Sequence, residues 1–126
     1  MQLLLKDELP FTTVMISNQG EAIEIDNVLV DTGSASTIFA ADVLATINVT
    51  PEPDDKLYAI RGVGGSETVF SREIDFVQVG EQRLDHFEIE IGGMDYGFEI
   101  NGILGMNFLA TVGAIINLRE FRIESR

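Results

Sequence analysis

The sequence predicts a single all-β domain over residues 1–126, with one or two short helices. Runs rich in β-branched and aromatic residues are separated by short clusters of Gly, Asn and Asp, which is typical of strands joined by tight turns. In several runs polar and apolar residues alternate, as in strands that bury one face. The chain has 12 Gly and only 3 Pro, which suits a turn-rich β fold. Its length supports one core and is too short to divide into two domains.

The charge balance excludes several classes of partner. The chain carries 21 acidic and 8 basic residues, a formal charge of −13, so no basic face for nucleic acid or an anionic membrane can be assembled. The absence of cysteine excludes disulfides, thiolate catalysis and cysteine-based zinc sites. The opening residues 1–6 lack the order of a signal peptide, and no run reaches the roughly 18 apolar residues of a membrane helix. We therefore expect a cytoplasmic protein.

The first predicted element is an antiparallel hairpin. Residues 10–17 and 21–30 are rich in strand formers, and Asn18-Gln19-Gly20 between them supplies turn residues. From Val28 the alternation stops and the run becomes apolar on both faces. This pattern is expected where a strand enters the core beneath a buried site.

A short helix is expected next. Ser36 or Thr37 can cap it, and it runs to about Ile47. An apolar face at roughly helical spacing is formed by Ile38, Phe39, Val43, Leu44 and Ile47. The polar segment 50–55 follows, and its prolines end the regular structure.

The middle of the chain predicts two further hairpins. Residues 57–61 and 67–71 are expected to be strands joined by the glycine-dense tip Gly62-Val63-Gly64-Gly65-Ser66. Glycines in such a tip let main chain approach main chain and let the loop open and close. Residues 73–79 and 83–91 alternate apolar with polar, which predicts a second hairpin with one solvated face.

The last third predicts an apolar strand, a short helix and a closing pair of strands. The strand ends at Ile103-Leu104-Gly105, and the helix runs from Met106 to about Thr111. Residues 113–118 are then expected to be a buried strand, with 121–123 pairing back onto it.

The candidate reactive group is Asp31, because the apolar run Val28–Val30 delivers this acid into a small-residue turn. Gly33 has no Cβ, so the loop can turn sharply and two acids can approach each other. The Thr32 hydroxyl can donate and accept hydrogen bonds, and Ser34 can donate to the Asp31 carboxylate. Asp31 is therefore predicted as the catalytic residue, with the residues that follow it as its support.

Three features in this order resemble the retropepsin-like aspartic proteases. They are Asp31-Thr32-Gly33 after an apolar strand, the tip Gly62–Gly65, and the segment Ile103-Leu104-Gly105 followed by Asn107. The resemblance covers about residues 11–118. It implies a single-lobe closed β-barrel in which Ile103, Leu104 and Gly105 pack beside the Asp31 loop. It also implies that Gly62, Val63, Gly64 and Gly65 form a flap that closes over an extended peptide.

That chemistry needs a second carboxyl. Peptide hydrolysis without a metal requires one carboxylate to take a proton from water and one carboxylic acid to protonate the carbonyl oxygen, so two carboxyls about 3 Å apart share one proton. Only one Asp-Thr-Gly is present, and Asp26, Asp42 and Asp54 lack comparable surroundings. We therefore predict a homodimer with Asp31 and its mate at the two-fold axis, acting on peptide or protein substrates.

Two departures from the retroviral pattern concern assembly. Retroviral members usually pair an acid two residues after the triad glycine with an arginine after the later glycine, whereas this chain has Ala35 and Met106 there. Retroviral chains also stop after the last apolar strand and interleave their termini. This chain continues through residues 119–126, so the dimer contact is expected to be built differently or to be weaker.

Two other functions remain open. The chain could be a catalytically silent peptide-binding or dimerisation module with the same fold, or a structural β domain in which the triad is accidental. His86 stands alone in a polar register and is assigned no chemistry. No calcium-loop pattern occurs, and the glycines at 62–65 match neither a phosphate-loop nor a dinucleotide-binding pattern, so neither a metal nor a cofactor is expected.

Overall fold

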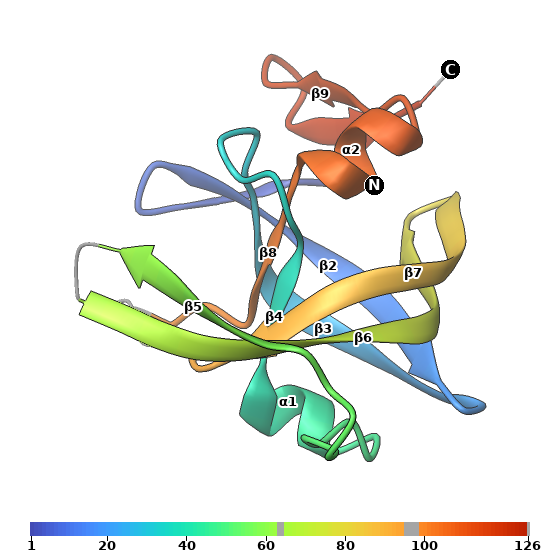
Figure 1. Ribbon diagram of the computed structural model, residues 1–126. Helices are drawn as coiled ribbons and strands as arrows, with labels where there is room; N and C mark the ends of the chain where they lie inside the picture. Colours follow the sequence, from blue (N-terminus) through green and yellow to red (C-terminus); the bar gives the residue numbers. More distant parts are fainter. Residues whose placement is uncertain (63–64, 95–98, 126) are drawn as a thin grey trace.

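The computed structural model describes residues 1–62, 65–94 and 99–125, and it is mostly β with two short helices (Figure 1). The predicted all-β class is confirmed. Neither described helix is long and apolar enough to cross a membrane. Along the chain the elements are β1 (Leu4–Lys6), β2 (Leu9–Asn18), β3 (Glu21–Val30), β4 (Ile38–Ala40), α1 (Ala41–Ala45), β5 (Leu57–Gly62), β6 (Gly65–Val79), β7 (Gln82–Gly92), β8 (Gly102–Leu104), α2 (Met106–Thr111), β9 (Ile115–Asn117) and β10 (Arg122–Glu124).

Six strands close into a barrel. The sheet order is β1-β2-β3-β8-β4-β7-β6-β5, and a further pairing of β2 with β6 joins the strands from β2 to β6 into a ring. The pairs β3–β8 and β4–β7 are parallel, and the other pairs in this sheet are antiparallel. β1 and β5 lie outside the ring. The closed single-lobe barrel implied by the resemblance is confirmed.

Alternating side chains of the strands fill the barrel, and buried side chains from both helices complete the core. Val14 and Ile16 of β2 are fully buried two residues apart, as a strand of period two requires. Leu44 of α1 and Phe108 of α2 are also fully buried, and the two helices lie toward opposite ends of the barrel (Figure 1). Phe108 packs edge-to-face on Phe87 with ring centroids 6.0 Å apart. Each such buried side chain contributes about 1.5–3 kcal/mol to folding.

The opening hairpin is confirmed as β2 and β3. Asn18 pairs with Glu21, and Gln19 and Gly20 at the tip both have positive φ, 51° and 84°. Two successive residues with positive φ match the right-handed twist of the flanking strands, which is why Gly is favoured there. The Gly20 N–H also donates to the Asp75 carboxylate on β6 at 2.9 Å, and this hydrogen bond is the largest cause of a lowered pKa for Asp75.

The prediction of a helix from residue 36 or 37 to 47 is wrong in its first part. α1 begins only at Ala41, and neither Ser36 nor Thr37 caps it. Residues 38–40 form β4, which pairs with β7 on one side and β8 on the other. β-Branched and aromatic side chains favour a strand with two neighbours over a helix whose propensity they lower.

The later strands differ from the prediction in length and burial. The segments 67–71 and 73–79 belong to one continuous strand, β6, which pairs first with β5 and then with β7. β9 and β10 pair as expected. The expectation that 113–118 is buried is wrong, because Ile115 is 37% and Leu118 59% exposed in the single chain.

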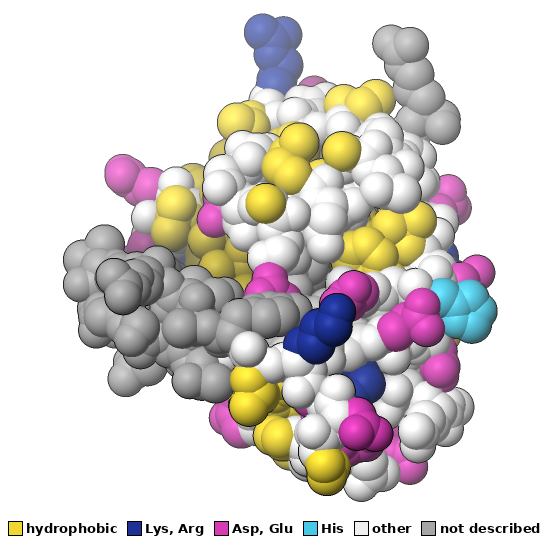
Figure 2. All heavy atoms as spheres, viewed as in Figure 1, with side chains coloured by type: hydrophobic (Ala, Val, Ile, Leu, Met, Phe, Trp, Pro, Cys, Tyr) yellow, Lys and Arg dark blue, Asp and Glu magenta, His cyan; other side chains and the backbone are white. Residues whose placement is uncertain are grey.

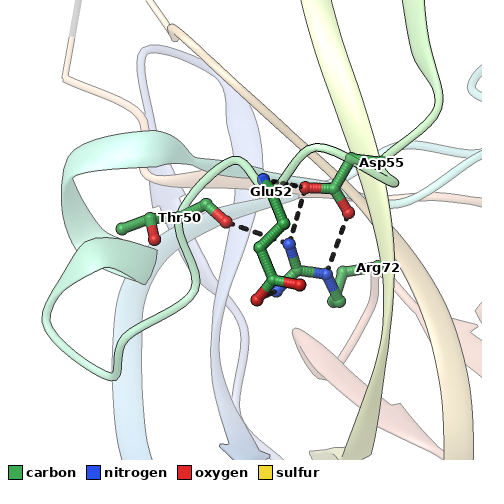
Figure 3. A network of polar contacts seen from close by, with 4 residues as sticks. All are labelled: Thr50, Glu52, Asp55 and Arg72. Carbon is green, nitrogen blue, oxygen red and sulfur yellow. Dashed lines mark hydrogen bonds and ion pairs between the residues drawn. The ribbon is translucent and has the colours of Figure 1, made fainter.

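A charged network fastens the 50–55 loop to β6 (Figure 3). The Arg72 guanidinium donates to both Asp55 carboxylate oxygens, at 3.2 and 2.7 Å, and to the Thr50 carbonyl at 2.9 Å. Glu52 completes the network at 3.5 Å from Arg72. Hydrogen bonding from Arg72 lowers the pKa of Asp55, against a smaller opposing effect of burial. The loop is therefore held to the barrel by a carboxylate that stays ionised.

Candidate active site

Asp31 lies at the end of β3, where the backbone of β8 fixes its position. Val30 pairs in parallel with Leu104, and the Asp31 N–H donates to the Leu104 carbonyl at 3.0 Å. Leu29 pairs with Ile103, which also pairs with Ile38 of β4. The Asp31 side chain is half-buried. The strand that precedes the acid and the strand predicted to pack beside it are therefore direct sheet neighbours.

The loop after Asp31 folds back on the acid. The Gly33 N–H donates to the Asp31 carboxylate at 2.8 Å, and the Ser34 N–H donates to the Asp31 carbonyl at 3.2 Å. The prediction that the Ser34 hydroxyl donates to Asp31 is wrong. That hydroxyl donates to the Ser36 carbonyl at 2.8 Å and so braces the loop itself. Thr32 and Gly33 are exposed at the tip of the turn.

Gly105 lies against the backbone of this loop. A Cβ at this position would be 2.0 Å from the Ser36 carbonyl oxygen and 2.9 Å from that of Ser34, distances that no side chain can occupy. The close approach lets the first N–H groups of α2 reach the loop. Met106 donates to the Ser34 carbonyl at 2.7 Å, and Asn107 donates to the Ala35 carbonyl at 3.2 Å. Glycine at 105 is thus a steric requirement.

A buried polar network that was not predicted from the sequence joins the loop to α2. The Thr37 side chain is fully buried, and its hydroxyl accepts from the Gly105 N–H at 3.1 Å and donates to the Asn107 amide oxygen at 2.7 Å. The same amide oxygen accepts from the Phe108 N–H at 2.9 Å. The only sequence signal was an asparagine two residues after Gly105. Its partner lies seventy residues away, so no local pattern indicates the pair.

A polar cleft of about 270 Å³ opens beside the loop, lined by Ser36, Thr37, Glu88, Glu90 and Asn107. It is bounded by β7, whose Glu90 N–H donates to the Thr37 carbonyl at 2.9 Å. Pockets that enclose a drug-sized ligand usually measure about 300–1,000 Å³. This cleft is therefore slightly smaller than such a pocket.

The glycine-rich tip belongs to the β5–β6 hairpin. Gly62 pairs with Gly65 at its end, and Val63 and Gly64 lie outside the described residues. Among the described residues, no hydrogen bond joins this hairpin to the Asp31 loop. Likewise, the described part of the chain holds no cluster of three or more His, Asp or Glu side chains that could bind a metal ion.

Two comparisons with known proteins bear on the family of this chain. A search of curated proteins finds no match. A family model described as gag-polyprotein putative aspartyl protease matches residues 14–111, which extend from within β2 to the last residue of α2 and include both Asp31 and Gly105, and the chain therefore belongs to that family.

Proposed function

We propose that the protein is an aspartic endopeptidase that is active as a homodimer, with Asp31 of each copy forming the catalytic pair. The observation that carries the proposal is the position of Asp31, which is held by backbone hydrogen bonds at the end of β3 while the loop beside it is exposed. Family membership supports the same assignment. A single chain supplies one such carboxyl, so a second copy is needed to supply the other.

The mechanism follows from two carboxyls that share one proton. The ionised Asp31 takes a proton from a water held between the pair, and the oxygen of that water attacks the peptide carbonyl carbon. The protonated Asp31 of the second copy gives its proton to the carbonyl oxygen. The first Asp31 then gives the proton it took from water to the amide nitrogen, and the second Asp31 takes a proton from one hydroxyl as the C=O bond reforms. The C–N bond breaks, which releases an acid and an amine and restores one ionised and one protonated Asp31. The Gly33 N–H, which donates to Asp31, orients the carboxylate for these transfers.

The substrate is proposed to be an extended peptide segment. The β5–β6 hairpin would cover it as a flap, and its glycines leave backbone N–H and C=O groups accessible for pairing with the peptide main chain. In this proposal the Asp31 loop is supported by Thr32, Ser34, Ile103, Leu104 and Gly105. No metal or cofactor takes part in any step.

The test is a peptide-library digest at mildly acidic pH with wild type, Asp31→Asn and Asp54→Asn. Asp54 is an exposed acid outside the loop, so its variant makes the same chemical change as a matched control. We expect Asp31→Asn to lower kcat/KM by at least about a thousandfold and Asp54→Asn to leave it unchanged. Cleavage that persists in Asp31→Asn would refute the proposal. Peptide binding without cleavage by the wild type would favour the silent binding module instead.

A further inference from the structure

The polar cleft beside the Asp31 loop is acidic along one wall only. β7 supplies Glu88 and Glu90 to it, whereas the end of the loop and α2 supply uncharged residues. The sequence has no Asp, Glu, Lys or Arg in residues 32–41 or 100–118, so neither of these two segments can offset the charge of the glutamates. Figure 2 shows acidic side chains below the mainly uncharged region over α2 and β9.

The two glutamates point away from the barrel core. Ile89 lies between them and Ile91 follows them, and both isoleucines are fully buried in the core. Successive side chains of a strand face opposite sides, so Glu88 and Glu90 share the outer face of β7. Glu88 is exposed and Glu90 is half-buried. The cleft therefore has one carboxylate near its mouth and one that is partly shielded from water.

No described basic side chain neutralises these two carboxylates. The ion pairs among the described residues use Arg72, Arg83 and Arg122, and none of them involves the cleft. Arg72, which pairs with Ile89 in the sheet, is held by the Asp55 carboxylate at 2.7 Å. The exposed Lys56 forms no ion pair within the described part of the chain. A cation that enters the cleft therefore meets two carboxylates that have no such partner.

Asn107 adds a hydrogen-bond donor to the same cleft. Its amide oxygen already accepts from the Thr37 hydroxyl at 2.7 Å and from the Phe108 N–H at 2.9 Å. These two donors fix the orientation of the amide, and the NH2 group faces away from them. The cleft thus offers carboxylate acceptors for a cation and a donor for a carbonyl oxygen, and a basic residue of a peptide carries both of these groups.

The cleft has room for one long side chain and lies within reach of a peptide bound at Asp31. Its volume is about 270 Å³, whereas a single water needs only about 10–15 Å³ of cavity. Ser36, which lines the cleft, follows Asp31 by five residues, and five residues span at most about 18 Å. An extended peptide advances about 3.3 Å per residue. A substrate side chain within about five residues of the cleaved bond can therefore reach the cleft.

We infer that this cleft binds a lysine or arginine side chain of the substrate, with Glu88 and Glu90 as the residues that determine this specificity. The inference rests on the proposed function, because it assigns the cleft to the peptide that Asp31 cleaves. The charge of −13 on the chain attracts cationic segments before contact. Charge-assisted hydrogen bonds to the two carboxylates then distinguish a basic side chain from a neutral one of the same shape.

The test begins with a random-sequence peptide library digested by wild type, in which mass spectrometry gives the residues around each cleaved bond. The best peptide is then made with arginine and with citrulline, which keeps the shape of arginine and removes its charge. We expect wild type to favour the arginine peptide at least about tenfold in kcat/KM, and the double variant Glu88→Gln/Glu90→Gln to favour it less than about twofold. The matched control is Glu24→Gln/Glu81→Gln, which removes two exposed charges outside the cleft and should keep the wild-type ratio.

A second double variant, Glu88→Lys/Glu90→Lys, tests the same point through a gain of function. It should favour a glutamate peptide over the arginine peptide, which a merely damaged protein would not do. Equal cleavage of the arginine and citrulline peptides by wild type, or a preference that the glutamine variant keeps, would overturn the inference and leave the catalytic proposal standing.

A binding measurement decides the inference even if wild type cleaves no peptide, which would refute the catalytic proposal. The same library is then passed over each immobilised protein, and the retained peptides are identified. Enrichment of lysine and arginine by wild type and the control, lost in the glutamine variant, would support the cleft as a site for basic side chains. Equal enrichment by all three proteins would overturn it.

Discussion

Replacing Gly105 with alanine should damage both the stability of the fold and the geometry of the Asp31 loop. The added Cβ would lie 2.0 Å from the Ser36 carbonyl oxygen, whereas a carbon and an oxygen normally approach to about 3.3–3.6 Å. The backbone must therefore open by more than about 1 Å, because the atom it meets is not the end of a flexible side chain. Overpacking of this kind costs about 1–3 kcal/mol, and we expect the upper end of that range.

The activity loss should exceed the loss that lower stability alone would produce. A misplacement of about 1 Å can reduce turnover a hundredfold, and the displaced segment directly follows Asp31-Thr32-Gly33, which contains the proposed catalytic acid. Gly102→Ala is the comparator, since its Cβ would meet the Phe39 ring at 2.6 Å inside the barrel and not the loop. Urea unfolding and peptide cleavage should show both variants destabilised, with the large drop in kcat/KM only for Gly105→Ala. A Gly105→Ala protein with unchanged unfolding midpoint and kcat/KM would refute this reasoning.

Thr37→Val should destabilise the fold by about 2–4 kcal/mol, because the Gly105 N–H and the Asn107 amide oxygen lose a buried partner. Chemical denaturation should show a smaller loss of unfolding free energy for Thr37→Ser, which keeps the hydroxyl. Arg72 holds the pKa of Asp55 below 3.8, so this contact contributes stability above about pH 4 and loses it as the pH falls through the lowered pKa. Asp55→Asn should therefore narrow the difference in unfolding midpoint between neutral and strongly acidic buffer. The dimer should be tighter at mildly acidic pH than at about pH 8, because protonation of carboxylates reduces the repulsion between two chains of charge −13.

Control measurements separate the proposed effects on unfolding and dimerisation from general effects of changing a surface charge or the buffer. Asp54→Asn changes an exposed neighbour of Asp55 and should leave the pH dependence of unfolding as in wild type. An Asp55→Asn protein that keeps the wild-type pH dependence would show that Arg72 does not stabilise the loop through this carboxylate. Sedimentation at equal ionic strength that gives one dissociation constant at both pH values would contradict the charge argument for the dimer.

Elements defined by local patterns could be predicted from the sequence. The opening hairpin follows from strand formers around a turn with Gly20, and α2 begins and ends where its apolar sequence after Gly105 predicted. The pairing of β9 with β10 followed in the same way. The position of Asp31 beside Leu104 was implied by the family resemblance, because parallel pairing of strands so far apart in the chain leaves no local signal.

Long-range interactions account for the parts that sequence reasoning missed. Ile38 and Phe39 lie at roughly helical spacing from the apolar residues that follow them. Residues 38–40 nevertheless form a strand, because β7 and β8 pair with them from both sides. The bond between Thr37 and Asn107 depends on a contact that only the closed barrel creates. Ile115 is likewise exposed because its burial depends on which elements pack over β9, and an apolar pattern alone does not specify them.

The place of β8 in the barrel has a consequence for biosynthesis. This strand lies between β3 and β4, yet the ribosome makes it long after both of them. A nascent chain can form the β2–β3 and β6–β7 hairpins early from neighbouring residues. The hydrogen bond from the Asp31 N–H to the Leu104 carbonyl can form only later. The Asp31 loop can therefore reach its final position only after Leu104 has been made.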